Sequence, residues 1–262
     1  MIKKIFLFSL KTIYRFLKLF GFDIKTIFYL KYYPKFLKQK KLWLNQGGQI
    51  TNQYTILSDY NDHAGKNKGH YFHQDLLISS LIFKDKPKRH IDVGSRIDGF
   101  VAAVASFREI EIIDIRSMPN TEHKNIKFTQ ADITSFSELT TIGKTDSLSC
   151  LHAIEHFGLG RYGDLVDING HQKGISNLIK LLAPFARFYI SFPIGMRDEV
   201  HFNAHRVFHP KSIFSSKDVS ENLKLIRFDY VDDNGDLFTE KNINDVIDKI
   251  TFGCGIYTFS KY

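Results

Sequence analysis

The stretch RHIDVGSRIDGFVAAVASF, residues 89–107, decides the expected fold. An apolar run with Ile91 and Val93 carries one acid, Asp92, and ends at Gly94. An alanine-rich pattern of helical type follows it. This order predicts a strand, a tight turn and a helix, the arrangement that holds a nucleotide-like cofactor at the end of a parallel strand.

The turn departs from a dinucleotide-binding loop. Only Gly94 and Gly99 remain, and Arg96 and Asp98 stand where further glycines are usual. A pyrophosphate beside the Asp98 carboxylate would be repelled. A cofactor without phosphate fits better, and S-adenosyl-L-methionine is one, because its amino group can meet a carboxylate and its own carboxylate can meet Arg96. The turn therefore favours S-adenosyl-L-methionine over a nicotinamide cofactor.

Strand-like and helical patterns alternate after this turn. Further strands are expected at 108–116, 125–132, 145–153 and 185–195, and helices at 134–143 and 174–184. Such alternation predicts an α/β fold with a mostly parallel sheet. Two late strand-like segments have no clear crossover between them, which predicts an antiparallel edge.

Acidic residues fall at or near three strand ends. Asp92 belongs to the first strand, Asp114 ends the second and Asp132 ends the third. Ligands of open α/β sheets bind beyond the carboxyl ends of the strands, and a carboxylate can accept both ribose hydroxyls. The competing interpretation is that these acids cap helices. The expected cofactor-binding residues are Asp92, Gly94, Ser95, Arg96, Asp114, Asp132 and Leu151.

The segment CLHAIEHFGLGRYGDLVDINGH, residues 150–171, concentrates polar groups beside the expected cofactor. His152 and His156 are four residues apart and would share one helix face. Either histidine is a candidate general base, oriented by Glu155 or Asp164. A metal site of histidines and carboxylates and a purely structural polar loop remain open alternatives.

Two loops supply candidate acceptor-binding residues. Arginine suits phosphate or carboxylate groups, which favours a binding role for the RYGDLVD run. The later segment FPIGMRDEVHFNAHRVFHP, residues 192–210, is cationic and rich in histidine. It suits an anionic acceptor such as a sugar nucleotide, unless it is only a solvated crossover. The expected substrate-binding residues are Arg161, Asp167, His171, Asn203, His205 and Arg206.

The N-terminal 45 residues form a basic, aromatic arm, expected to be followed by a linker at 46–68 and the α/β domain at 69–262. The first 44 residues hold eleven Lys or Arg and one acid, so they account for the net charge of +8. The body is therefore nearly neutral, which argues against a nucleic-acid partner.

Apolar residues of the arm recur every three or four positions from Ile2 to Phe20, with lysines opposite, which predicts an amphipathic helix. No apolar run approaches the ~20 residues of a membrane span. Residues 1–44 therefore either pack on the body or bind an anionic membrane surface. The two cysteines, Cys150 and Cys254, are expected to be buried free thiols, and a cytoplasmic location follows, at the inner face of the membrane if the arm binds lipid.

Several segments together carry a family resemblance. HIDVGSRIDGFVA, IEIIDIR, DSLSCLHAIEHFGLGRYGD, PIG and FNAHRVF resemble a domain-of-unknown-function family among class I S-adenosylmethionine-dependent methyltransferase-like proteins, over roughly residues 69–235. The resemblance implies a Rossmann-like, seven-stranded methyltransferase sheet and a link to bacterial surface-glycan loci. In the class I pattern, Asp92 and Gly94 match the first acid and glycine, Asp114 the ribose-binding acid and Asp132 the adenine-side acid.

The leading hypothesis is an O-methyltransferase that acts on a sugar, sugar-nucleotide or lipid-linked glycan in surface-polysaccharide biosynthesis. A second hypothesis keeps the fold without catalysis, as a glycan or sugar-nucleotide binding module. A third is a metal-dependent transferase or hydrolase that uses the histidine-rich loops. No metal ligand set is assigned from the sequence.

Overall fold

The computed structural model describes residue 17, residue 21, residues 24–247 and residues 249–262. The chain divides into two compact units, Met1–Lys66 and Asn67–Tyr262. The amphipathic helix expected between Ile2 and Phe20 falls almost entirely outside the described residues. In the part of the chain that is described, no helix has the length and apolar character needed to cross a membrane.

The first unit contains helix α2 (Ile24–Tyr29), the 3-10 turns η1 (Leu30–Tyr32) and η2 (Ser58–Asn61), and helix α3 (Tyr33–Asn45). Pro34 lies in the first turn of α3. Proline is accepted there because its missing N–H has no helical acceptor in any case. Gly48 contacts the indole of Trp43, since a Cβ at this glycine would lie 2.3 Å from Nε1.

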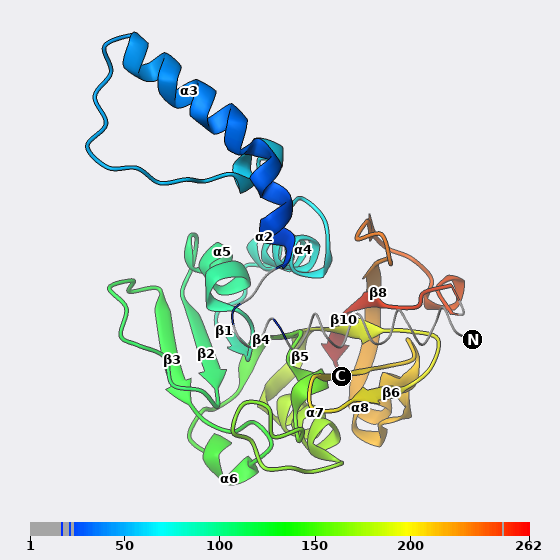
Figure 1. Cartoon of the computed structure of the whole chain (residues 1–262). Helices are drawn as coiled ribbons and strands as arrows, with labels where there is room; N and C mark the ends of the chain where they lie inside the picture. Colours follow the sequence, from blue (N-terminus) through cyan, green and yellow to red (C-terminus); the bar gives the residue numbers. More distant parts are fainter. Residues whose placement is uncertain (1–16, 18–20, 22–23, 248) are drawn as a thin grey trace. The chain divides into compact units, whose positions relative to one another are not determined.

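The second unit is built on one eight-stranded sheet (Figure 1). The strand order is β3-β2-β1-β4-β5-β10-β8-β9. The strands are β1 (His90–Val93), β2 (Ile110–Asp114), β3 (Ile126–Gln130), β4 (Thr145–Leu151), β5 (Leu182–Ile194), β8 (Leu223–Val231), β9 (Leu237–Phe238) and β10 (Gly253–Lys261). A separate hairpin joins β6 (Glu199–His201) to β7 (His205–Val207).

Strands β1 to β5 are parallel, and β10 is antiparallel to both of its neighbours, β5 and β8. The expected Rossmann-like α/β sheet with an antiparallel edge is therefore confirmed. The sheet has eight strands rather than seven because the two-residue β9 pairs with the end of β8. Strand β1 lies in the middle and all four of its residues are buried, as expected of a parallel strand covered on both faces.

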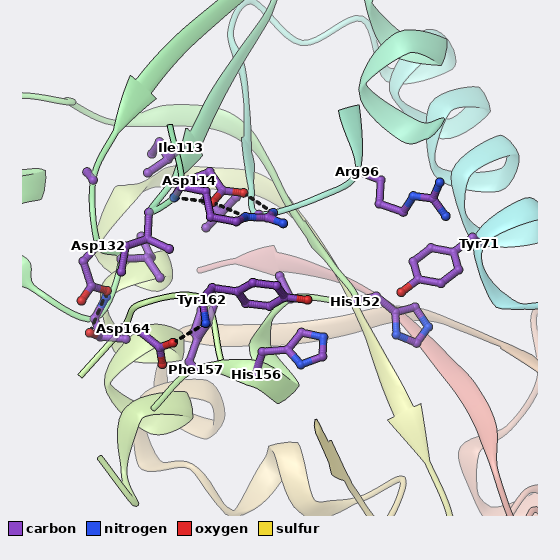
Figure 2. A pocket seen from close by; sticks show the side chains of 18 residues that line it. Tyr71, Arg96, Ile113, Asp114, Asp132, His152, His156, Phe157, Tyr162 and Asp164 are labelled. Atoms are coloured by element: carbon purple, nitrogen blue, oxygen red, sulfur yellow. Dashed lines mark hydrogen bonds and ion pairs between the residues drawn. The ribbon is translucent and has the colours of Figure 1, made fainter. Parts of the chain in front are cut away.

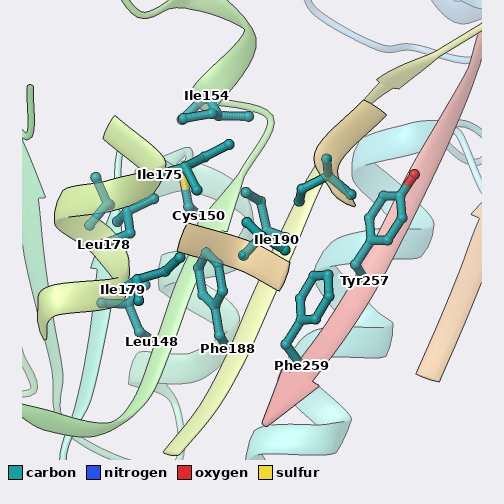
Figure 3. Packing of buried hydrophobic residues seen from close by; sticks show 14 of the residues in the cluster. Leu148, Cys150, Ile154, Ile175, Leu178, Ile179, Phe188, Ile190, Tyr257 and Phe259 are labelled. Atoms are coloured by element: carbon teal, nitrogen blue, oxygen red, sulfur yellow. The ribbon is translucent and has the colours of Figure 1, made fainter. Parts of the chain in front are cut away.

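Helices cover both faces of this sheet (Figure 1). Helices α4 (His70–Asp85) and α5 (Ala102–Ala105), with the turn η3 (Ile97–Val101), pack on one face. Helices α7 (Gly170–Leu181) and α8 (Lys217–Asn222), with η5 (Ser212–Ser215), pack on the other, and α6 (Phe136–Leu139) follows β3. The core under α7 is shown in Figure 3. There Leu178 and Ile179 of α7 belong to one apolar cluster with Leu148, Phe188 and Phe259 of the sheet.

The two cysteines lie in different cores and are free thiols, as expected. Cys150 belongs to the core under α7, and Cys254 belongs to the core under α4. Burial raises the pKa of the Cys150 thiol well above its usual value. Cys150 is therefore an inert apolar side chain.

The chain after β4 does not form the expected helix. His152 has a positive φ of 51°, and only the 3-10 turn η4 (Ile154–His156) follows. His152 and His156 consequently do not share a helix face. The reason lies in the contacts at the strand end, where the backbone N–H of His152 donates to the carbonyl of Ser191 at 3.0 Å.

Candidate functional site

A pocket opens at the carboxyl ends of β1, β2 and β3 and is closed by the segment after β4 (Figure 2). Its lining combines acids, histidines and aromatic rings with apolar groups. The lining residues are Tyr71, Val93, Gly94, Arg96, Ile113, Asp114, Ile115, Arg116, Ala131, Asp132, Ile133, Thr134, His152, Ala153, His156, Phe157, Tyr162 and Asp164. The sequence-predicted residues Gly94, Asp114 and Asp132 are thus brought together.

Gly94 forms the turn at the end of β1. Its φ is +73°, and a Cβ at this position would lie 2.8 Å from the Cβ of Ala153. Only glycine meets both conditions without strain. Glycine therefore lets the turn after β1 pack directly against Ala153 in the segment after β4.

Asp92 does not line the pocket, in contrast to its expected cofactor contact. Its side chain is 0% exposed and accepts hydrogen bonds from Ser149 Oγ at 2.5 Å and Ser95 Oγ at 2.6 Å. Burial raises the pKa of this carboxyl to about 6. Ser95 Oγ also accepts the backbone N–H of Leu151 at 3.3 Å. Asp92, Ser95 and Leu151 therefore hold β1, its turn and β4 together beneath the pocket.

Asp114 lies at the end of β2 and points into the pocket, but it has an ion-pair partner. Arg116 donates from Nη2 to Asp114 Oδ2 at 2.6 Å and from Nε to Oδ1 at 2.9 Å. The guanidinium carbon of Arg116 also lies 4.6 Å from the ring centroid of Tyr162. In this arrangement Arg116 occupies the acceptor oxygens that a ribose would use.

Asp132 lies just after β3 and lines the same pocket. Its Oδ1 accepts hydrogen bonds from the backbone N–H and the hydroxyl of Thr134, both at 2.8 Å. Its other oxygen, Oδ2, accepts no hydrogen bond from the described residues. The carboxylate thus keeps acceptor capacity.

Arg96 contributes to the rim through its contact with an aromatic ring. Its guanidinium pairs with Asp98 at 2.9 Å and lies 5.2 Å from the ring centroid of Tyr71. Both charged groups are exposed, so the Asp98 carboxylate is directed to solvent with Arg96 rather than into the turn. The repulsion expected from Asp98 is therefore weak.

His152 and Glu155 form a buried pair at the pocket edge. His152 Nδ1 donates to Glu155 Oε1 at 2.8 Å, while His152 Nε2 and Glu155 Oε2 have no hydrogen-bond partner among the described residues. Burial disfavours the charged imidazole, yet Cys254 and Glu155 together hold the pKa of His152 well above its usual value. Glu155 therefore orients His152, as one of the two expected pairings had it.

His156 presents the second ring to the pocket (Figure 2). Its Nδ1 donates to the carbonyl of Ala204 at 2.8 Å, which leaves Nε2 as the acceptor nitrogen. Arg161 donates to the same carbonyl at 2.7 Å and does not line the pocket. Burial lowers the pKa of His156, so the ring is neutral near pH 7.

Asp164 organises the loop that carries Tyr162 instead of orienting a histidine. Its carboxylate accepts backbone N–H groups of Gly158 at 2.7 Å, Gly160 at 3.2 Å and Tyr162 at 3.2 Å. The ring of Tyr162 meets that of His156 edge-on, with centroids 5.3 Å apart. The loop thereby places an aromatic ring in the middle of the pocket.

The remaining expected substrate-binding residues lie outside this pocket. Asp167 pairs with Lys173 at 2.6 Å, and the buried Arg206 donates to the carbonyl of Phe157 at 2.6 Å. The others are distributed as follows: His171 lines two other hollows, Asn203 is exposed between β6 and β7, and His205 packs on Phe252. Asp167 and Arg206 are therefore structural residues of the loops.

Among the pocket residues that were not predicted are Tyr71, Arg116 and Tyr162. Tyr71 lies in α4, the helix that precedes the first strand of the sheet. Arg116 could have been found, because it follows Asp114 by two residues at a strand end. Tyr162 lies in the segment 150–171, from which other site residues were predicted.

A family model described as Caenorhabditis protein of unknown function, DUF268, matches residues 101–214. This match supports the resemblance to a domain-of-unknown-function family and includes the loop after β4. No curated protein matches the chain.

Several solved structures share the α/β architecture. N-methyltransferase NodS from Bradyrhizobium japonicum WM9, in complex with S-adenosyl-L-homocysteine, is 14% identical, with 79% of this chain and 93% of that chain covered and a TM-score of 0.49. An S-adenosylmethionine-dependent methyltransferase from Clostridium acetobutylicum ATCC 824 is 12% identical, with 72% and 91% covered and a TM-score of 0.48. At such low similarity, the case for a function rests on the pocket.

Proposed function

We propose that this protein is an S-adenosylmethionine-dependent methyltransferase. The observation that carries the proposal is the convergence of Gly94, Asp114 and Asp132 on one pocket above three adjacent parallel strands. Ligands of open α/β sheets bind at this edge. The family resemblance of the sequence implies the same class.

The pocket residues fit the parts of the cofactor. Asp114 would accept the ribose hydroxyls, after Arg116 has turned away from it. Asp132 and the apolar side chains of Ile113 and Ile133 would surround the adenine. Gly94 and Arg96, which line the pocket after β1, would face the amino-acid portion.

The neutral His156 is the residue best placed to accept a proton. S-adenosyl-L-methionine, when bound, supplies an electrophilic methyl group, and S-adenosyl-L-homocysteine is the product that leaves. His156 Nε2 would take the proton of an acceptor hydroxyl as the new C–O bond forms. The bond from Nδ1 to Ala204 fixes the ring in the required tautomer.

The acceptor that we propose is the hydroxyl of a sugar, a sugar nucleotide or a lipid-linked glycan in surface-polysaccharide biosynthesis. The resemblance to a family of surface-glycan loci motivates this choice. A proton-accepting histidine also suits a hydroxyl, which must lose its proton on methylation. Methyl transfer to a panel of nucleotide sugars would identify the acceptor.

Calorimetry with S-adenosyl-L-methionine and S-adenosyl-L-homocysteine tests the proposal. We expect both to bind, and Asp114→Asn to weaken binding about 10–100-fold through loss of two charge-assisted hydrogen bonds. Glu109→Gln, which removes an exposed carboxylate just before β2, is the matched control and should bind normally. If neither ligand binds the folded wild-type protein, the non-catalytic binding module is the better assignment.

We further propose that the arm binds an anionic membrane surface. Leu42 and Trp43 of α3 are both more than half exposed, at 57% and 55%, and Lys38 and Lys41 lie beside them. Exposed apolar groups interleaved with lysines suit the interface of a membrane that contains acidic lipids. Such an arm would keep the catalytic unit near lipid-linked acceptors.

A further inference from the structure

We infer that His70, His152 and Cys254 form a binding site for a transition-metal ion of the zinc class. The site belongs to the second unit and lies beside the cofactor pocket, to which it contributes only His152. The inference is independent of the proposed methyl transfer, because metal content is measured without cofactor or acceptor.

Three distant parts of the chain bring the candidate ligands together. His70 begins α4, His152 follows β4, and Cys254 lies near the start of β10. One ligand atom of each residue lies within 4.8 Å of the other two. Zinc bonds of ~2.0–2.3 Å place neighbouring tetrahedral ligand atoms roughly 3.5 Å apart. The rings of His70 and His152 are stacked with an interplanar angle of 11°, so one ring has to rotate before both can direct a nitrogen at the same ion.

The surroundings are dry and aromatic. Cys254 is 0% exposed and His152 is 8% exposed. The ring centroid of His70 lies 5.2 Å from that of His152 and 5.7 Å from that of Phe252, and Tyr71 packs 4.9 Å from His152. Water therefore competes little with a metal ion for the ligand atoms in such a setting.

Glu155 prepares His152 as a ligand. Its Oε1 accepts a hydrogen bond from His152 Nδ1, so the remaining nitrogen, Nε2, can carry a free lone pair. That Nε2 atom is buried and has no hydrogen-bond partner in the described part of the chain. Metal-bound histidines almost always donate their other N–H to a carboxylate or carbonyl in this way.

The charges also suit a cation. A thiolate at Cys254 and the carboxylate of Glu155 would match the two positive charges of a divalent ion, which makes burial of the ion tolerable.

The ligand set selects the kind of metal. Two imidazoles and one thiolate suit zinc or another late transition metal and exclude calcium or magnesium, which prefer oxygen ligands. Three protein ligands leave a fourth position for water or a polar group of a substrate.

Metal loading of the full-length protein tests this site. The protein is stripped with a chelator and titrated with Zn²⁺ or Co²⁺ alone. We expect about one ion per chain, a thiolate-to-cobalt charge-transfer band in the near ultraviolet, and a higher Tm with zinc. Failure of the folded protein to bind either ion at tenfold excess would overturn the inference.

Variants separate these ligands from the rest of the chain. Cys254→Ala should abolish the cobalt band, whereas Cys150→Ala, which removes the other buried cysteine, should keep it. If Cys254→Ala fails to fold, His70→Gln replaces it as the variant that should lose the cobalt band. His123→Gln, which changes an exposed histidine, is its control. A full cobalt band in folded Cys254→Ala or His70→Gln would refute the ligand assignment.

A change at the supporting carboxylate gives a graded result. Glu155→Gln should weaken zinc affinity about 10–100-fold, since it removes the charge behind His152 without removing a ligand. Unchanged zinc affinity in this variant would contradict the orienting role of Glu155.

Discussion

At the scale of single residues, Asp92 shows how one acid can be expected in the site and yet act beneath it. Its carboxyl is enclosed by Ser95 and Ser149, so it ties the first turn to β4. The pKa of the buried carboxyl is raised to about 6 from its ordinary value of 3.8. The folded protein therefore holds this proton more tightly than the unfolded chain does.

This raised pKa predicts a fall in stability as pH rises. Between about pH 4 and pH 6 the folded state keeps the Asp92 proton while the unfolded state has lost it. The free energy of unfolding should decrease by about 3 kcal/mol over this range from this group. Asp92→Asn should remove that part of the pH dependence. Urea unfolding of both proteins at several pH values measures the difference, and parallel curves would contradict the assignment.

We expect the pH dependence of the proposed methyl transfer to follow the protonation of His156. Burial lowers its pKa, so the base becomes active as pH rises through a value below the usual 6.5, and the rate should already be level at pH 7. His156→Gln should reduce the single-turnover rate about 10²–10⁴-fold. The rate is followed with a methyl-labelled cofactor and the acceptor found in the nucleotide-sugar panel. His123→Gln should behave as wild type, and an undiminished rate in His156→Gln would exclude this base.

The sequence allowed part of the site to be predicted and concealed the rest for physical reasons. Asp114 and Asp132 are evident because parallel strands end at a common edge. The inward direction of Asp92 depends on hydroxyl partners on β4, which are distant in sequence. Arg116 was missed because an ion pair to Asp114 requires the side chain to fold back along its own strand end.

At the scale of elements, the loop between β4 and α7 shapes the pocket through backbone contacts. Gly158 has a φ of +78°, and a Cβ there would lie 2.0 Å from the carbonyl oxygen of Asp167. A Cβ at Gly170, the first residue of α7, would lie 2.7 Å from the Cα of Gly158. The two glycines let the loop pass directly against the helix.

Gly158→Ala should therefore lower the stability of the protein more than the same change at a glycine with open space around it. Gly163 also has a positive φ, of +89°, but a Cβ there would meet nothing within 4 Å. Gly163→Ala should cost about 1–2 kcal/mol from the backbone alone, and Gly158→Ala should cost clearly more. Thermal unfolding and cofactor calorimetry compare the two variants. Equal losses would mean that the close approach is not important for the pocket.

The elements themselves were largely predictable, and their local geometry was not. The alternation of patterns indicated β1 to β5 and the helices between them, because strand and helix periods differ. The insertion of β10 between β5 and β8 depends on long-range pairing that no local pattern reveals. The β6–β7 hairpin was hidden in a segment so polar that it reads as a loop.

At the scale of the whole molecule, the charge and the chemistry belong to different units. The basic residues that give the chain its net charge are concentrated in the first 44 residues, whereas the pocket belongs to the second unit. The anionic membrane surface that we propose as the partner of the arm would suit both this charge and the exposed side chains of Leu42 and Trp43.

Vesicle flotation tests the arm in the full-length protein. We expect flotation with vesicles that contain acidic lipid, less with zwitterionic vesicles, and a decrease as salt is raised. The double substitution Leu42→Ser and Trp43→Ser should weaken binding about tenfold, because two interfacial apolar groups are lost. Leu165→Ser with Ile168→Ser changes two apolar residues of the second unit that are more exposed, at 83% and 82%, and should leave flotation unchanged. If the two double variants float alike, the lipid is bound elsewhere and the arm does not place the enzyme at a membrane.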